Sequence, residues 1–70
     1  MRRLYASQFW SGSDWRTAYL SSFRPDAEEA FDNCIEVNPT RQYRLVSFTV
    51  SDLDFVATQA TNYEVIDTFN

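Results

Sequence analysis

Residues that commonly carry catalysis are scarce in this chain of 70 amino acids, which contains no histidine and no lysine. Nucleophilic catalysis usually needs a histidine base beside a serine, threonine or cysteine, and Schiff-base chemistry needs a lysine. Structural zinc sites need clustered cysteines and histidines, and phosphate loops need several glycines, but the chain has one cysteine and one glycine. The sequence therefore predicts a protein that is not an enzyme, uses no metal or cofactor, and acts by binding.

Long apolar runs and cysteine pairs are missing too. Because Cys34 is the only cysteine, an intramolecular disulfide is excluded, and with it the disulfide-stapled class of small secreted proteins. No signal-peptide-like apolar stretch follows Arg2 and Arg3, and nowhere do about eighteen apolar residues run together. We therefore expect a cytoplasmic protein that does not enter a membrane.

Positive charge comes from arginine alone, since six arginines face ten acids and give a formal net charge of −4. Residues 1–25 hold four arginines and one acid, whereas residues 26–70 hold two arginines and nine acids. A net negative charge disfavours direct nucleic-acid binding, because cation–phosphate contacts supply most of that affinity. Either the opposite charges meet as ordinary surface ion pairs after folding, or the molecule presents an acidic surface.

An N-terminal β-hairpin is predicted from two alternating segments. Residues 3–10 alternate and are rich in aromatic side chains, which favours a strand. Residues 11–14 contain Gly12, which accepts the positive φ that a tight turn needs. The alternation resumes over residues 15–23, and two strands joined by four residues are typical of a hairpin.

A helix is predicted after the hairpin. Pro25 suits the first helical turn, where its missing N–H removes no hydrogen bond, and the acids beside it favour the positive end of the helix dipole. The helix should end at Asn38, because Pro39 cannot continue it. Its apolar stripe has helical spacing and consists of Ala27, Ala30, Phe31, Cys34 and Ile35.

The rest of the chain predicts further strands. Residues 43–50 alternate between two faces, as do residues 63–69, and both read as strands. Residues 51–62 fit either a short second helix or an irregular turn, since helix-compatible and strand-preferring residues are mixed there. The expected fold is a single α+β domain over residues 1–70, a small two-layer sandwich of ββαββ order that buries one helix stripe against one sheet face.

Two candidate partner-binding surfaces emerge from these elements. Five acids cover the polar side of the predicted helix: Asp26, Glu28, Glu29, Asp32 and Glu36. They form either a solubilising surface or a phosphate-like face offered to a basic groove. The hairpin interleaves arginines with aromatic rings, a mixture used by protein hot spots and single-strand nucleic-acid binders. Its candidate residues, which are core residues in the alternative interpretation, are Tyr5, Phe9, Trp15, Arg16 and Tyr19.

In size, acidity and lack of catalytic residues, the chain resembles the small α+β proteins by which bacteriophages inhibit host machinery, such as anti-CRISPR proteins and polymerase inhibitors. The resemblance implies a stoichiometric inhibitor that occludes a site on a larger, nucleic-acid-handling protein or protein–nucleic acid complex. The acidic helix or the aromatic hairpin would be its contact surface. Two alternatives stay open: a self-assembling structural protein or homodimer whose strand edges pair between copies, and an arginine-aromatic binder of single-stranded nucleic acid.

Overall fold

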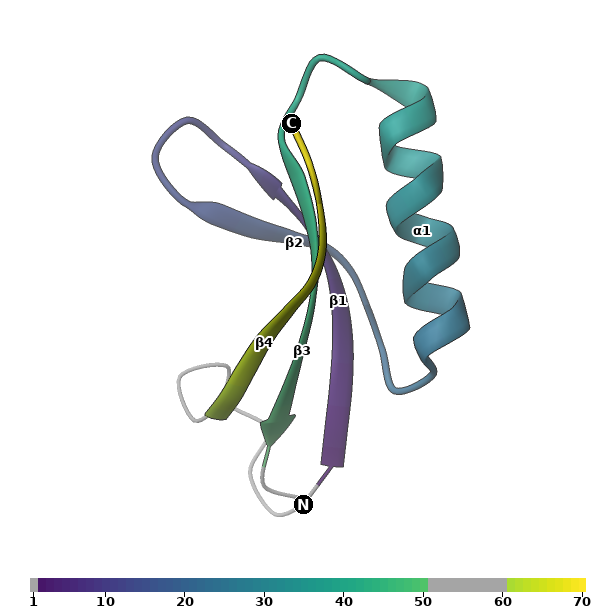
Figure 1. The fold of residues 1–70 in the computed structure, drawn as a ribbon, viewed down its shortest axis with the longest axis vertical. Helices are drawn as coiled ribbons and strands as arrows, with labels where there is room; N and C mark the ends of the chain where they lie inside the picture. Colours follow the sequence, from purple (N-terminus) through teal and green to yellow (C-terminus); the bar gives the residue numbers. More distant parts are fainter. Residues whose placement is uncertain (1, 51–60) are drawn as a thin grey trace.

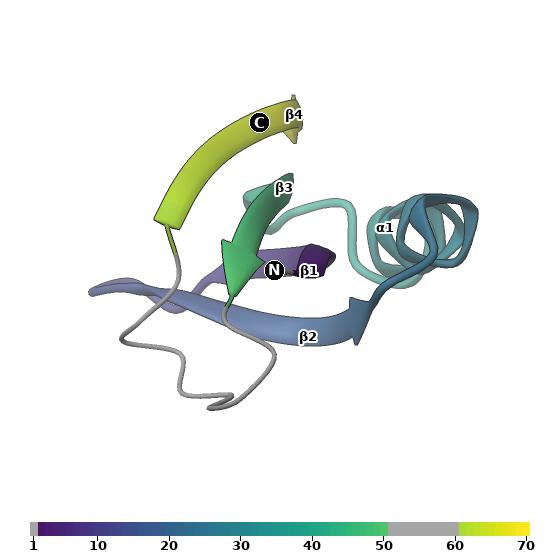
Figure 2. The ribbon, with the colours of Figure 1, turned by 90° about the horizontal axis from the view of Figure 1, so that it is seen from below.

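One helix and four strands make up the part of the chain that the structure, a computed structural model, describes: residues 2–50 and 61–70. In chain order they are β1 (Arg2–Trp10), β2 (Trp15–Ser21), α1 (Arg24–Val37), β3 (Tyr43–Val50) and β4 (Thr61–Phe69). The strands form one antiparallel sheet in the order β2-β1-β3-β4 (Figure 1). Figure 2 shows α1 on one side of this twisted sheet, so the predicted two-layer α+β fold is confirmed.

The predicted hairpin is present and brings β1 into the middle of the sheet. Gly12 has a φ of 102° in the loop between the strands, a conformation that a side chain would strain. The register pairs Trp10 with Trp15 and Ser7 with Tyr19, and a bulge leaves Ala18 of β2 without a partner in β1. The second strand ends at Ser21 rather than at residue 23, because the chain turns there toward the helix.

The helix begins and ends where Pro25 and Pro39 predict. Phe23 is extended just before the first turn, which contains Pro25. At the other end the Asn38 N–H donates to the Cys34 carbonyl at 3.0 Å, and Pro39 follows. Ala27 and Phe31 are buried, and Ala30, Cys34 and Ile35 are half-buried, which confirms the predicted stripe.

Apolar side chains are buried on both faces of the sheet, whereas one buried face was expected. The helix-side cluster contains Ala27, Phe31, Tyr43 and Leu45, with Tyr5 and Phe9 among the half-buried residues around it. Strand alternation places the second cluster on the opposite face, and it consists of Leu4, Ala6, Val46, Phe48 and Val50. Apolar side chains from both faces of the strand predicted over residues 43–50 are therefore part of a core cluster.

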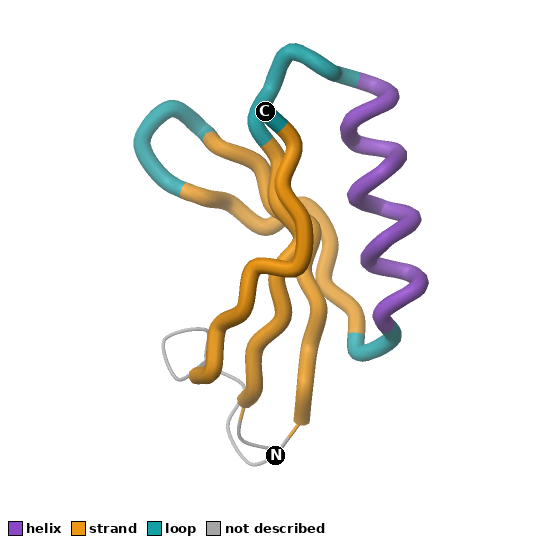
Figure 3. The backbone as a smooth tube through the Cα atoms, in the orientation of Figure 1, coloured by secondary structure: helices purple, strands orange, loops and turns teal. Residues whose placement is uncertain are grey.

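The last strand, β4, is longer than predicted, since it starts at Thr61 rather than at Tyr63. Asn62 has a φ of 55° and lies where the pairing with β3 shifts register. The predicted short helix or turn over residues 51–62 lies outside the described residues, apart from the two that open β4. Figure 3 shows how the loops before and after α1 connect it to the sheet. No helix in residues 2–50 or 61–70 is long and apolar enough to cross a membrane.

Candidate functional site

The acidic residues of α1 form one exposed surface, as their spacing predicts. Asp26, Glu28, Glu29, Asp32 and Glu36 are all exposed, and together they are called the acidic face below. Arg24 approaches Glu28, with 3.7 Å between its Nε and Oε2. Within the described part of the chain, the other four acids have no arginine within 4.0 Å. Asp67 of β4 lines a surface groove of about 290 Å³ together with Glu28, Asp32 and Arg24, so three acids and one arginine meet where the helix faces the sheet.

Four of the five remaining arginines make their contacts away from the acidic face. Arg3 crosses β3 and donates to Glu64 at 2.9 Å and to the buried Ser47 Oγ at 2.7 Å. Arg16 donates to Asp14 at 3.3 Å. Two more lie over aromatic rings rather than beside carboxylates. The expected surface ion pairs thus exist in part, but they leave the helix strongly negative.

The candidate residues of the hairpin do not share one surface. Tyr5 and Phe9 are half-buried and pack against the core cluster beneath α1. Tyr19 lies on the same side of the sheet but is 42% exposed. Trp15 lies on the opposite face, where it packs edge-on against Trp10 with ring centroids 5.4 Å apart. A role for these residues in binding stays a prediction, and Tyr19 and Trp15 cannot contact one flat partner together.

Tyr19 joins the two predicted surfaces. It lines a shallow groove of about 280 Å³ with Asp26 and Glu29 of the helix. An aromatic ring beside carboxylates offers apolar contact area together with charge, and tyrosine is enriched at the centre of protein interfaces. The acidic face and one hairpin ring therefore form a continuous surface.

Trp15 belongs to a polar and aromatic cluster on the sheet face opposite α1. The Arg44 guanidinium carbon lies 4.4 Å from the centroid of the Trp15 ring. Arg44 Nε donates to Gln8 Oε1 at 2.7 Å, and Gln8 Nε2 donates to Thr17 Oγ1 at 3.2 Å. Burial lowers the pKa of Arg44 below its usual value, although a guanidinium stays charged near neutral pH. This cluster links three strands through one guanidinium.

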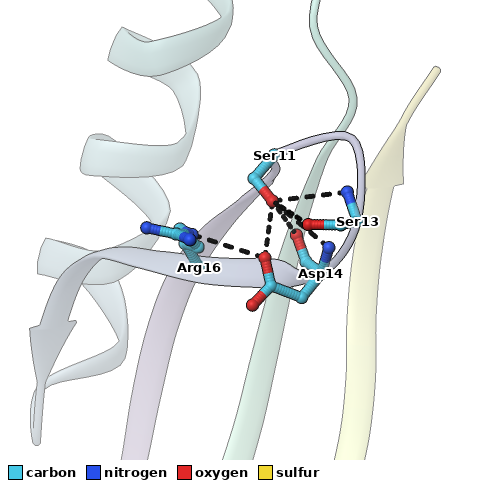
Figure 4. A network of polar contacts seen from close by, with 4 residues as sticks. All are labelled: Ser11, Ser13, Asp14 and Arg16. Atoms are coloured by element: carbon cyan, nitrogen blue, oxygen red, sulfur yellow. Dashed lines mark hydrogen bonds and ion pairs between the residues drawn. The ribbon is translucent and has the colours of Figure 1, made fainter.

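The hairpin loop is held by a small polar network (Figure 4). Ser11 Oγ accepts from the Asp14 N–H at 3.2 Å and hydrogen-bonds the Asp14 carboxylate at 2.5 Å. Arg16 Nε donates to the same carboxylate oxygen. The Ser11 hydrogen bond, followed by the Arg16 hydrogen bond, lowers the pKa of Asp14 below its usual value. Arg16 is therefore oriented by the loop that precedes it.

A larger groove opens between this hairpin loop and the loop from α1 to β3. It has a volume of about 610 Å³, and Phe9, Trp10, Arg16, Arg41 and Gln42 are among its lining residues. We call it the guanidinium groove. The sequence predicts Phe9 and Arg16 as candidate binding residues but not Arg41, because nothing in the sequence of the loop around Pro39 indicates that it will lie beside the hairpin loop.

Among residues 2–50 and 61–70, no three His, Cys, Asp or Glu side chains are grouped in a way that would hold a metal ion. No protein-family model, curated protein or solved structure significantly matches this chain. Its function is therefore inferred from the arrangement of its side chains.

Proposed function

We propose that this protein is a non-catalytic binding module that uses its acidic face, with Tyr19 at the edge, to occupy a basic site on a larger partner protein. One observation carries the proposal: four of the five helix acids have no arginine partner in the described residues, although the chain contains six arginines. Surfaces that steer no partner usually intersperse charges of both signs. A face whose charges are all negative instead favours binding to a positively charged surface of another molecule.

The expected partner handles nucleic acid, because proteins of that kind carry basic grooves that follow a phosphate backbone. Carboxylates spaced along a helix can occupy such a groove and exclude the polyanion. The proposal therefore includes the inhibitor function suggested by the resemblance to phage proteins of the anti-CRISPR or polymerase-inhibitor type. In this role the protein is a stoichiometric competitor of the partner's nucleic acid, and it acts in the cytoplasm.

The test compares two variants with the same net charge. Glu29→Gln with Glu36→Gln neutralises two acids on the acidic face, and Asp14→Asn with Glu64→Gln neutralises two acids elsewhere. Proteins that the immobilised wild type retains from a host lysate are identified, and the affinity of the purified partner is then measured against salt concentration. We expect the helix variant to bind at least about tenfold more weakly, because each desolvated charge pair contributes about 1.5 kcal/mol or more.

Binding by the helix variant should also depend less steeply on salt, since fewer charges take part. A control variant that loses as much affinity as the helix variant would show that the helix acids contribute no more than other acids, and would contradict the proposal. The partner's nucleic acid should compete with the wild type for the same site. A partner complex that binds its nucleic acid unimpeded would remove the inhibitor part of the proposal.

Self-assembly through strand edges is the less favoured function, because both edge strands are irregular. β2 carries a bulge at Ala18, and β4 shifts register against β3 between Leu45 and Val46 and again between Ser47 and Thr49. Bulges twist an edge and oppose pairing between copies. Sedimentation equilibrium distinguishes the two functions, and we expect a monomer at concentrations where edge pairing would give a dimer.

A further inference from the structure

The guanidinium groove continues into an apolar groove, and the two are lined in common by Phe9 and Arg41. The apolar part has a volume of about 430 Å³ and runs along the C-terminal end of α1, where Cys34 and Val37 line it. Val37 is 85% exposed, so this part has an open apolar wall. One continuous surface therefore has a polar, cationic half and an apolar half.

Hydrogen bonds fix both walls of the cationic half. On the hairpin side, Ser11 Oγ holds the backbone and carboxylate of Asp14, which in turn orients Arg16 (Figure 4). On the other side, the Asn70 side-chain amide donates to the Pro39 carbonyl at 3.0 Å and to the Arg41 carbonyl at 3.3 Å. The Trp10 N–H donates to the Gln42 carbonyl at 2.9 Å and ties the two walls together. A groove held in this way loses little entropy when a ligand enters it.

The charge of the cationic half is opposite to that of the whole chain. The described residues that line it include Arg16 and Arg41 and no acid. The Arg41 guanidinium carbon lies over the Phe9 ring, 5.1 Å from its centroid, and the Arg41 side chain is exposed, so it can still reach a ligand. Arg16 contacts Asp14 through Nε at 3.3 Å, and both side chains are more than half exposed. Guanidinium edges in this arrangement suit a planar carboxylate.

We propose that the combined groove binds a short peptide segment of a partner protein in which a carboxylate side chain stands next to an apolar one. The carboxylate lies against Arg41 and Arg16, and the apolar side chain packs between Phe9 and Val37. This surface is separate from the acidic face, and the inference does not rest on the proposed function.

A peptide fits the charge of this site better than single-stranded nucleic acid does. A single strand needs cations along several phosphates and stacking rings on one open face. The groove offers two guanidinium groups, and Phe9 is already covered on one side by Arg41. The apolar half also lies beside the last turn of α1, where Glu36 and the negative end of the helix dipole repel a polyanion. One or two carboxylates satisfy the arginines without that repulsion.

The experiment measures fluorescence anisotropy with the full chain and three labelled probes. The first is a short, otherwise uncharged peptide with one Asp and one Glu, each next to a Leu or Phe, the second is its Asn and Gln counterpart, and the third is a short oligothymidylate. We expect the acidic peptide to bind at least about tenfold more tightly than its amide counterpart, because charge-assisted hydrogen bonds are about twice as strong as neutral ones. Arg41→Gln and Arg16→Gln should each weaken acidic-peptide binding about tenfold, which is the effect of losing one such contact.

Arg24→Gln is the matched control, since it removes one guanidinium at the first residue of α1, at the opposite end of the helix from the groove. It should leave acidic-peptide binding unchanged, and Val37→Asp should weaken it, because that substitution places a carboxylate in the apolar half. All four side chains are exposed, so circular dichroism should report a native fold for every variant. The proposal is overturned by equal binding of the two peptides, by no binding of the acidic one, or by an equal loss in Arg24→Gln. Oligothymidylate binding that depends on Arg41 would overturn it in favour of nucleic acid.

Discussion

Ser7 and Ser47 are two buried serines on the helix side of adjacent strands, and we predict that replacing them with alanine changes stability in opposite directions. Ser7 is 0% exposed and Ser47 is 1% exposed. Ser7 Oγ has no hydrogen-bond partner among the described residues, whereas Ser47 Oγ accepts from Arg3 Nη2 at 2.7 Å. The two substitutions delete the same atom and differ in whether that atom is hydrogen-bonded.

A buried hydroxyl without a partner costs about 1–3 kcal/mol of desolvation. Ser7→Ala removes this cost and loses a few atomic contacts, so we expect the free energy of unfolding to rise by about 1 kcal/mol. In a domain of this size that change raises Tm by about 4–8 °C. Ser47→Ala should instead lower the free energy of unfolding by about 1 kcal/mol, because Arg3 is partly exposed and water replaces part of the lost bond.

Urea unfolding followed by tryptophan fluorescence and by circular dichroism measures both changes. Unchanged m-values would show that each substitution acts on stability rather than on the compactness of the unfolded chain. If Ser7→Ala destabilises the protein as much as Ser47→Ala does, then the Ser7 hydroxyl has a partner in solution, and the reasoning from its burial is wrong.

Three further predictions concern charged side chains. Glu36→Lys should raise the free energy of unfolding by about 0.3–1 kcal/mol in urea titrations, because the last turn of α1 has no basic residue to oppose the negative end of the helix dipole; a decrease would contradict this. Arg44→Lys should lower it by about 1 kcal/mol and alter Trp15 fluorescence, since lysine replaces neither the stacked guanidinium nor its hydrogen bond to Gln8; unchanged emission and stability would refute the role of the cluster. The pKa of Asp14 is lowered in the folded state, so its stabilising contribution is present above the unfolded pKa of about 3.9 and is lost as pH falls through the folded value. The stability difference between wild type and Asp14→Asn should therefore be largest above about pH 5 and shrink as the pH falls below the unfolded pKa. A pH-independent difference would contradict the network around Ser11.

Local pattern was enough to predict the elements and the shape of the acidic face. Residues 43–50 form a strand within the predicted bounds, and Pro25 and Pro39 mark the ends of the helix. The acids are exposed on α1 because helical spacing alone decides which residues share a side. These features depend on residues that are close in sequence. The spacing of apolar residues, every 2 positions in a strand and every 3.6 in a helix, therefore indicates them directly.

Features that depend on strand order could not be predicted. Alternation separates Tyr5 and Phe9 from Leu4 and Ala6, but it does not indicate which set the helix covers. In the structure one set packs beneath α1 and the other lies in the cluster on the opposite face. The guanidinium groove has the same origin, because Arg41 faces the hairpin only once β3 pairs with β1.

The commitments of the arginines explain why the acidic face keeps its charge. A chain without lysine carries all its positive side chains as guanidinium groups, which are suited to bridging and stacking rather than to diffuse neutralisation. Arg3 reaches Glu64 across the full width of β3, Arg44 stacks on Trp15, and Arg41 stacks on Phe9. Each of these contacts connects neighbouring strands or fixes a loop to the sheet. An arginine that turned toward the helix acids instead would lose its contact. Four of the five acids of α1 therefore have no arginine beside them in the described residues, and under the proposed function the partner's basic groove supplies the missing cations.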